Sequence, residues 1–116
     1  MENRFIIGEV QMNISIANDF SDVPAGRYLS DGDYSGEKFR EDFLLPALRN
    51  ANESNLVIVD INGVEGYGSS FLEEAFGGLV RKGGFSEKGL KGKLKIIANE
   101  EYSIYKEIIE NYIKEA

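Results

Sequence analysis

The apolar run Leu56-Val-Ile-Val-Asp-Ile61 marks the centre of the predicted fold of this 116-residue chain. It has too little polar alternation for an edge strand, so it predicts a strand that is buried on both faces at the centre of a sheet. Alternating apolar residues at positions 10–16 predict an edge or near-edge strand, and Leu94–Ile97 predicts another strand. Residues 5–8 can supply a short extra strand.

Three amphipathic segments with helical spacing alternate with the predicted strands. The first is predicted to begin at Ser35 or Gly36, the second at Ser69 or Ser70, and the third with Asn99 as its N-cap. This alternation predicts an α/β fold, with a small, mixed, mostly parallel sheet of about four strands packed with about three helices.

The length and composition of the chain exclude several classes of protein function. The chain has room for one hydrophobic core, so we predict a single domain over residues 1–116. It contains no cysteine and no histidine, which excludes thiol nucleophiles, zinc-thiolate sites, serine-histidine triads and imidazole metal ligands. We therefore expect no cofactor and no catalytic residue of these kinds.

The charge pattern and hydropathy limit the partners. A net charge of −7 repels a phosphate backbone, so we expect no nucleic-acid partner. The basic residues between positions 81 and 95 are interrupted by glycines and are interpreted as a solvated loop. No stretch approaches the roughly 20 apolar residues that span a bilayer, and the N-terminus lacks a signal-peptide pattern. These features predict a cytoplasmic protein without a membrane partner.

Three blocks of the chain form an ordered pattern. They are Gly26-Arg27-Tyr28, Ser35-Gly-Glu-Lys-Phe-Arg40, and Ser69-Ser-Phe-Leu-Glu-Glu-Ala-Phe76. The pattern resembles the STAS-like family of domains of unknown function and, more distantly, the STAS domains named for sulphate transporters and anti-sigma-factor antagonists. The resemblance implies a STAS-like fold in a bacterial-type signalling context.

The resemblance also implies a role for the turn before the second helix. In anti-sigma-factor antagonists, a serine matching Ser70 is phosphorylated by a histidine-kinase-like ATPase, which changes the affinity for that partner. Gly68 and Phe71 replace the aspartate and glycine that flank the serines there. The alternative role of Ser70 is structural, because Ser70 and Glu73 have the spacing of a capping box.

The long loop carries a second group of candidate residues. Residues 18–36 are rich in turn-forming residues, and Asp31, Asp33, Ser35 and Glu37 place oxygen atoms at alternate positions that a hard cation could use. Turn and cap chemistry explains the same residues, so we predict no metal site. We expect Asp60 to bond turn amides at the end of its strand.

Opposite charges in the motif blocks suggest a contact between the loop and the second helix. Arg27 and Arg40 can pair with the loop carboxylates or with Glu73 and Glu74, which would lock the loop to the helix. Phe71 at the helix start is interpreted as an exposed anchor for a partner.

The sequence is compatible with three functions. The leading hypothesis is a non-enzymatic, regulatory protein-interaction domain that binds a partner through Ser69, Ser70, Phe71 and Glu74. One alternative is a small metal-dependent enzyme that uses the carboxylates Asp31, Asp33, Asp60, Glu73 and Glu74. The other alternative is a structural domain that forms a homodimer through its tyrosine- and isoleucine-rich last helix.

Overall fold

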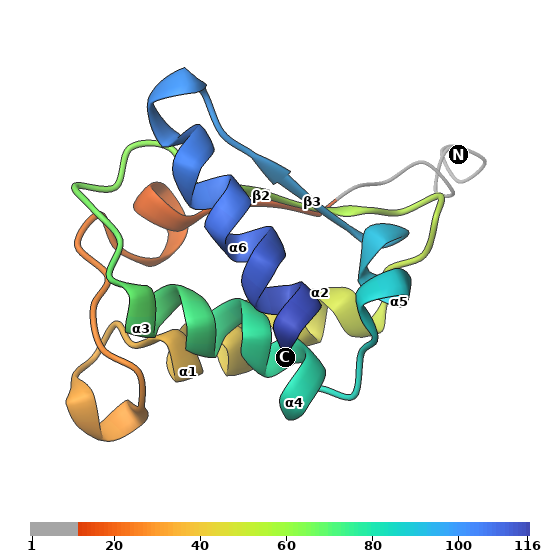
Figure 1. Ribbon diagram of the computed structural model, residues 1–116, viewed down its shortest axis with the longest axis horizontal. Helices are drawn as coiled ribbons and strands as arrows, with labels where there is room; N and C mark the ends of the chain where they lie inside the picture. Colours follow the sequence, from red (N-terminus) through yellow and green to blue (C-terminus); the bar gives the residue numbers. More distant parts are fainter. Residues whose placement is uncertain (1–11) are drawn as a thin grey trace, which may run out of the picture.

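The computed structural model describes residues 12–116, which form a three-stranded parallel sheet covered by helices (Figure 1). The strands are β1 (Met12–Ser15), β2 (Val57–Asp60) and β3 (Leu94–Ile97), in the order β1-β2-β3. The edge and central strands are therefore confirmed, and within these residues the sheet has three strands rather than about four. The strand predicted at residues 5–8 lies outside the described residues.

Two long helices connect the strands, and each contains a π-helical turn. The first helix is continuous through α1 (Gly36–Phe39), the turn η4 (Arg40–Leu44) and α2 (Leu45–Arg49). The second helix is continuous through α3 (Ser69–Leu72), the turn η5 (Glu73–Gly77) and α4 (Gly78–Arg81). The remaining helical elements are η2 (Ile16–Phe20), η3 (Leu29–Asp31), α5 (Glu87–Lys91), η6 (Glu100–Tyr102) and α6 (Ser103–Glu115).

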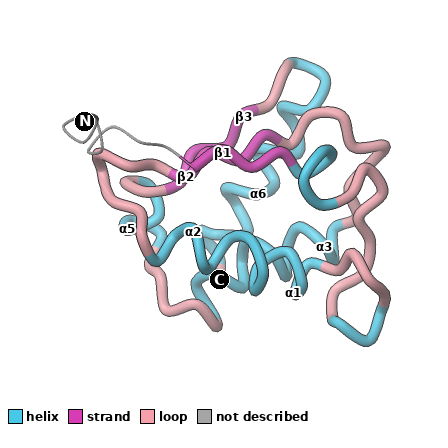
Figure 2. Tube along the Cα trace, turned by 180° about the vertical axis from the view of Figure 1, so that it is seen from behind, coloured by secondary structure: helices cyan, strands magenta, loops and turns pink. Residues whose placement is uncertain are grey.

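The two long helices and α6 lie on one face of the sheet, as Figures 1 and 2 show from opposite sides. Right-handed crossovers between neighbouring parallel strands place both connections on the same face. On that face the paired residues Ile14, Val59 and Ile96 are buried. On the other face Ile58 and Asp60 are only half-buried. The prediction that the central strand is buried on both faces was therefore wrong.

The last helix, α6, begins about one turn after the residue predicted to cap it. Asn99 stands at the predicted N-cap position, but it precedes η6, and its side chain makes no cap bond. Its backbone N–H instead donates to Oδ1 of Asn62 at 2.8 Å. In α6, Ile109 and Ile113 are buried and the helix packs against the second helix, which confirms the amphipathic pattern of the third predicted segment.

The basic segment at residues 81–95 is not a loop throughout, which corrects the prediction. It contains α5, whose N-cap Ser86 accepts a hydrogen bond from the N–H of Gly89 at 3.0 Å, and whose Leu90 is buried. Within residues 12–116, no helix has the length and apolarity to cross a bilayer.

Candidate functional site

The long loop between η2 and the first helix is tied down by backbone bonds. Ala25 N–H donates to the carbonyl of Tyr34 at 3.0 Å, and Gly36 N–H donates to the carbonyl of Gly26 at 2.9 Å. Gly26 has a φ of 95°, which favours glycine because a side chain there would be strained. The Asp31 carboxylate accepts from the N–H groups of Arg27 and Tyr28 and closes the turn. The loop therefore holds one defined shape.

This loop carries four exposed large apolar or aromatic side chains. Val23 is 52% exposed, Tyr28 47%, Leu29 57% and Tyr34 47%. Exposed apolar side chains that gather on one loop favour an interaction site, because each one costs free energy while it remains in water. The sequence interpretation did not single out these four side chains, since turn-forming neighbours suggested only a loop.

The turn before the second helix lies beside this loop. Glu65 N–H donates to the carbonyl of Asp22 at 2.9 Å, which joins the turn to the start of the loop. Figure 1 shows the loop next to the first turn of α3, where Ser69 and Ser70 are exposed. We call the combined area the loop-turn surface; its residues are Val23, Tyr28, Leu29, Tyr34, Ser69 and Ser70.

The serines are not used to cap the helix. Gly68 is the N-cap, no side chain caps the first turn, and Ser69 is the first helical residue. The capping box predicted for Ser70 and Glu73 was wrong, because two arginines bind the Glu73 carboxylate instead. The hydroxyls of Ser69 and Ser70 are therefore exposed beside a helix start that has no side-chain cap.

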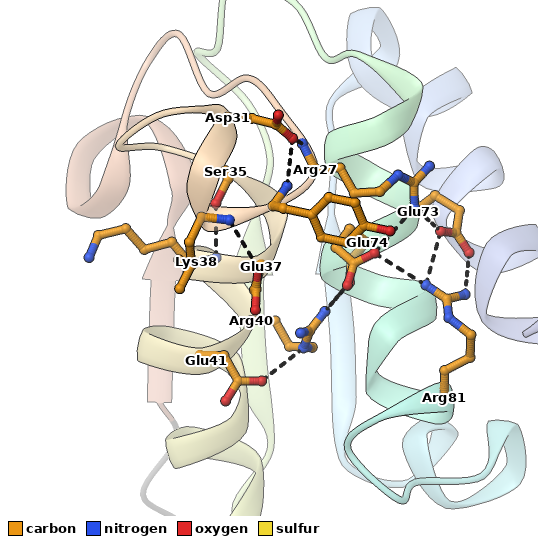
Figure 3. A network of polar contacts seen from close by, with 12 residues as sticks. Arg27, Asp31, Ser35, Glu37, Lys38, Arg40, Glu41, Glu73, Glu74 and Arg81 are labelled. Atoms are coloured by element: carbon orange, nitrogen blue, oxygen red, sulfur yellow. Dashed lines mark hydrogen bonds and ion pairs between the residues drawn. The ribbon is translucent and has the colours of Figure 1, made fainter.

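An ionic network fixes the loop to the second helix (Figure 3). Arg27 Nη1 donates to Glu73 Oε1 at 2.6 Å and to Glu74 Oε1 at 3.2 Å. Arg40 Nη1 donates to Oε2 and to the backbone oxygen of Glu74, both at 2.7 Å. Arg81 forms a bidentate pair with Glu73, at 2.5 and 3.0 Å. The predicted pairing of Arg27 and Arg40 with these two carboxylates is confirmed.

The network keeps its carboxylates ionised. Hydrogen bonds from Arg81, then Arg27, hold the pKa of Glu73 below its usual value. Burial opposes ionisation of Glu74, but the bonds from Arg40 and Arg27 outweigh it, so the pKa of Glu74 is also lowered. The bond to Glu73 raises the pKa of both Arg27 and Arg81.

The centre of the network is buried between the two long helices. Arg40 is 1% exposed and Glu74 is 2% exposed. They come from η4 and η5, and such π-helical turns often occur at functional sites. A Cβ atom at Gly78 would collide with the Arg40 guanidinium. Close packing around Arg40 therefore explains this glycine inside a helix.

Two of the predicted partner-binding residues are in the interior. Phe71 is 0% exposed and lies 6.0 Å, between ring centroids, from both Phe39 and Tyr67. The prediction that Phe71 is an exposed anchor was therefore wrong. Glu74 is buried by its arginines and cannot contact a partner directly. Ser69 and Ser70 are the members of that predicted set that a partner can touch.

The candidate carboxylates do not converge. Asp31 bonds the amides of its own turn, and Asp60 accepts from Asn62 N–H at 2.9 Å, which confirms the predicted turn role. Ser35 is the predicted N-cap, and its Oγ accepts from Lys38 N–H at 3.2 Å. Within residues 12–116, no cluster of three or more carboxylates is arranged to hold a metal ion.

Comparison with known proteins places the chain in a family. A family model described as a STAS-like domain of unknown function (DUF4325) matches residues 35–103. This range contains both long helices, β2, β3 and the serine turn, and it begins after Arg27. The searches of curated proteins and of solved structures gave no significant match.

Proposed function

Because this chain belongs to the family of STAS-like domains of unknown function, we propose that it is a non-enzymatic, regulatory protein-interaction domain whose partner binds the loop-turn surface. The observation that carries the proposal is the presence of four exposed apolar side chains on one loop that is held in one shape. A rigid apolar surface binds with a small entropic cost, because it is already ordered before the partner arrives.

The ionic network supports this proposal by presenting the surface. Arg27 belongs to the loop, and its guanidinium bonds both carboxylates of η5. Arg40 holds the same element from the first helix. The network therefore fixes the loop relative to the helix that carries Ser69 and Ser70. A partner that contacts both segments would find them already in position.

We further propose that phosphorylation of Ser70 regulates this binding and that the partner is a histidine-kinase-like ATPase. A phosphate adds roughly −1.5 to −2 charges at neutral pH. At Ser70 it would stand one helical turn from Glu73 and Glu74, in the first turn of α3, next to which the loop lies. Added charge and hydration at this position would oppose the burial of an apolar interface.

The test uses the whole chain with an affinity tag in a lysate of its native cell. The wild type, Leu29→Ser and Ser70→Glu are compared, and retained proteins are identified by mass spectrometry. The matched control is Ser54→Glu, which adds the same charge in the exposed turn before β2, at the opposite end of the strand from the Ser70 turn. To test phosphorylation, the wild-type protein is incubated with ATP and the proteins that it retained from the lysate. Its phosphorylated peptides are then mapped by mass spectrometry.

The proposal expects an ATPase that wild type and Ser54→Glu retain and that Leu29→Ser and Ser70→Glu lose. It also expects phosphate on Ser70. If all four proteins retain the same partners, the loop-turn surface is not the binding site. If a partner is lost only with Leu29→Ser, the surface binds but Ser70 does not regulate it.

A further inference from the structure

A groove lies along the edge of the sheet that β3 forms, on the opposite side from β1. It has a volume of about 450 Å³ and is formed by α5, β3 and α6. Figure 1 shows α6 in front of the sheet beside β3, with α5 next to the start of that strand. The groove is separate from the loop-turn surface, which contains no residue of these three elements.

The groove has an apolar floor and a basic rim. Leu90, Ile96 and Ile113 are buried and form part of its wall, together with the half-buried Leu94. The rim carries four lysines, namely Lys91, Lys95, Lys106 and Lys114. Two glutamates, Glu87 and Glu110, also line the groove, and Glu87 already pairs with Lys91 at 3.8 Å.

This local charge contrasts with the rest of the chain. The protein has a net charge of −7, yet lysines outnumber carboxylates two to one in this groove. Among residues 12–116, Lys95, Lys106 and Lys114 form no ion pair with a carboxylate within 4 Å. A groove of this kind attracts negative charge at close range although the whole molecule repels it.

The groove also borders a backbone edge that can accept another strand. β3 pairs with β2 on one side, and no other strand within residues 12–116 pairs with it on the other side. Lys93 and Ile97 direct their carbonyls to β2, where they accept from Val57 and Ile61. Alternation along a strand therefore directs the backbone groups of Leu94 and Ile96 away from β2, toward the open edge.

From the edge, the apolar floor and the lysine rim together, we infer that β3 is a docking site for an acidic, extended segment of a partner protein, which adds a strand to the sheet. Main-chain bonds to the edge would supply affinity. Lys95 and the α6 lysines stand on the two sides of this edge and would select segments in which Asp or Glu alternate with apolar residues. Lysines on an edge strand disfavour pairing with neutral or basic strands, so the same residues provide selectivity.

The test measures binding of labelled twelve-residue peptides to the full chain by fluorescence anisotropy. The probe alternates Glu and Val; one comparison peptide carries Lys in place of Glu, and another is the probe with every amide N-methylated. The protein variants are Lys106→Glu, which reverses a charge on the rim, and Lys88→Glu, which makes the same change on α5 at an exposed position outside the groove. Lys88 is exposed and Lys106 is half-buried at the rim of the groove; circular dichroism of both variants checks that each is folded.

We expect the acidic probe to bind, and Lys106→Glu to weaken binding by about tenfold while Lys88→Glu changes it little. N-methylation should weaken binding by about tenfold or more, because it removes the donors needed for strand addition while keeping every charge. Equal binding of the Lys peptide or of the N-methylated probe would overturn the inference. So would equally tight binding of a single-stranded oligonucleotide, because the site would then bind polyanions in general.

Discussion

The buried pair between Arg40 and Glu74 gives the sharpest test of how the fold is held together. Arg40→Met removes the guanidinium but keeps a long apolar side chain in its place. The Glu74 carboxylate, 2% exposed, then loses its bond at 2.7 Å and keeps Arg27 at 3.2 Å and Arg81 at 3.5 Å. Breaking a buried ion pair from one side costs about 3–5 kcal/mol.

That magnitude is a large part of the free energy of unfolding of a small domain, which is about 5–15 kcal/mol. Urea unfolding followed by circular dichroism measures it directly. The double variant Arg40→Met with Glu74→Leu removes both charges and should recover most of the loss, because an apolar pair of similar volume is often as stable as a buried ion pair. A loss below about 1 kcal/mol for Arg40→Met alone would refute this reasoning.

Three further outcomes are expected. Gly78→Ala should lower the free energy of unfolding in urea by about 1–3 kcal/mol, because the new Cβ would collide with the Arg40 guanidinium. This loss should exceed the gain from the better helix propensity of alanine. Equal or higher stability would show that Arg40 does not pack closely against Gly78. The stability that comes from the lowered pKa of Glu74 is present above the ordinary carboxyl pKa and is lost as pH falls through the lower folded value. Urea midpoints from pH 7 to pH 3 should therefore fall less steeply for Glu74→Gln than for wild type, and parallel curves would show that Glu74 contributes nothing. Arg27→Ala should increase cleavage in the long loop by about fivefold, as expected from the loss of about 1 kcal/mol of ion pairing, whereas the control Arg49→Ala, at an exposed position on the first helix, should leave cleavage unchanged.

Periodicity and charge were enough to predict the main framework. The apolar run that starts at Leu56 became β2, and Ser35 became the N-cap of the first helix. The opposite charges of Arg27 and Glu73 predicted a contact across 46 positions of sequence. These features could be predicted because burial and ion pairing follow from residue type.

Other features depend on contacts between distant segments. Ser70 and Glu73 have the local spacing of a capping box, but the carboxylate binds Arg81, eight residues later, and Arg27. Phe71 stands at a helix start, where exposure was expected, but aromatic rings from other elements cover it. In both cases contacts between distant segments determine the outcome, and the local spacing of residues carries no information about those contacts.

The start signal of α5 was present in the sequence. Ser86 followed by Glu87 is a typical helix N-terminus, since serine caps the first turn and the carboxylate favours its positive end. The neighbouring glycines Gly84 and Gly89 favoured a loop, and Leu90 alone was too little to indicate a buried face. Burial of Leu90 stabilises this short helix beyond its local propensity.

Binding of a partner at the loop-turn surface is tested by site-specific photo-cross-linking. A photoreactive phenylalanine analogue is placed at Leu29 on the loop and, as a control, at Met12, which is 54% exposed on β1, at the opposite edge of the sheet from β3. After irradiation in a native lysate, we expect a discrete cross-linked product from position 29 that is absent from position 12 and absent when Ser70→Glu is also present. Cross-links from position 12 alone, or equal cross-links from both positions, would contradict the proposal.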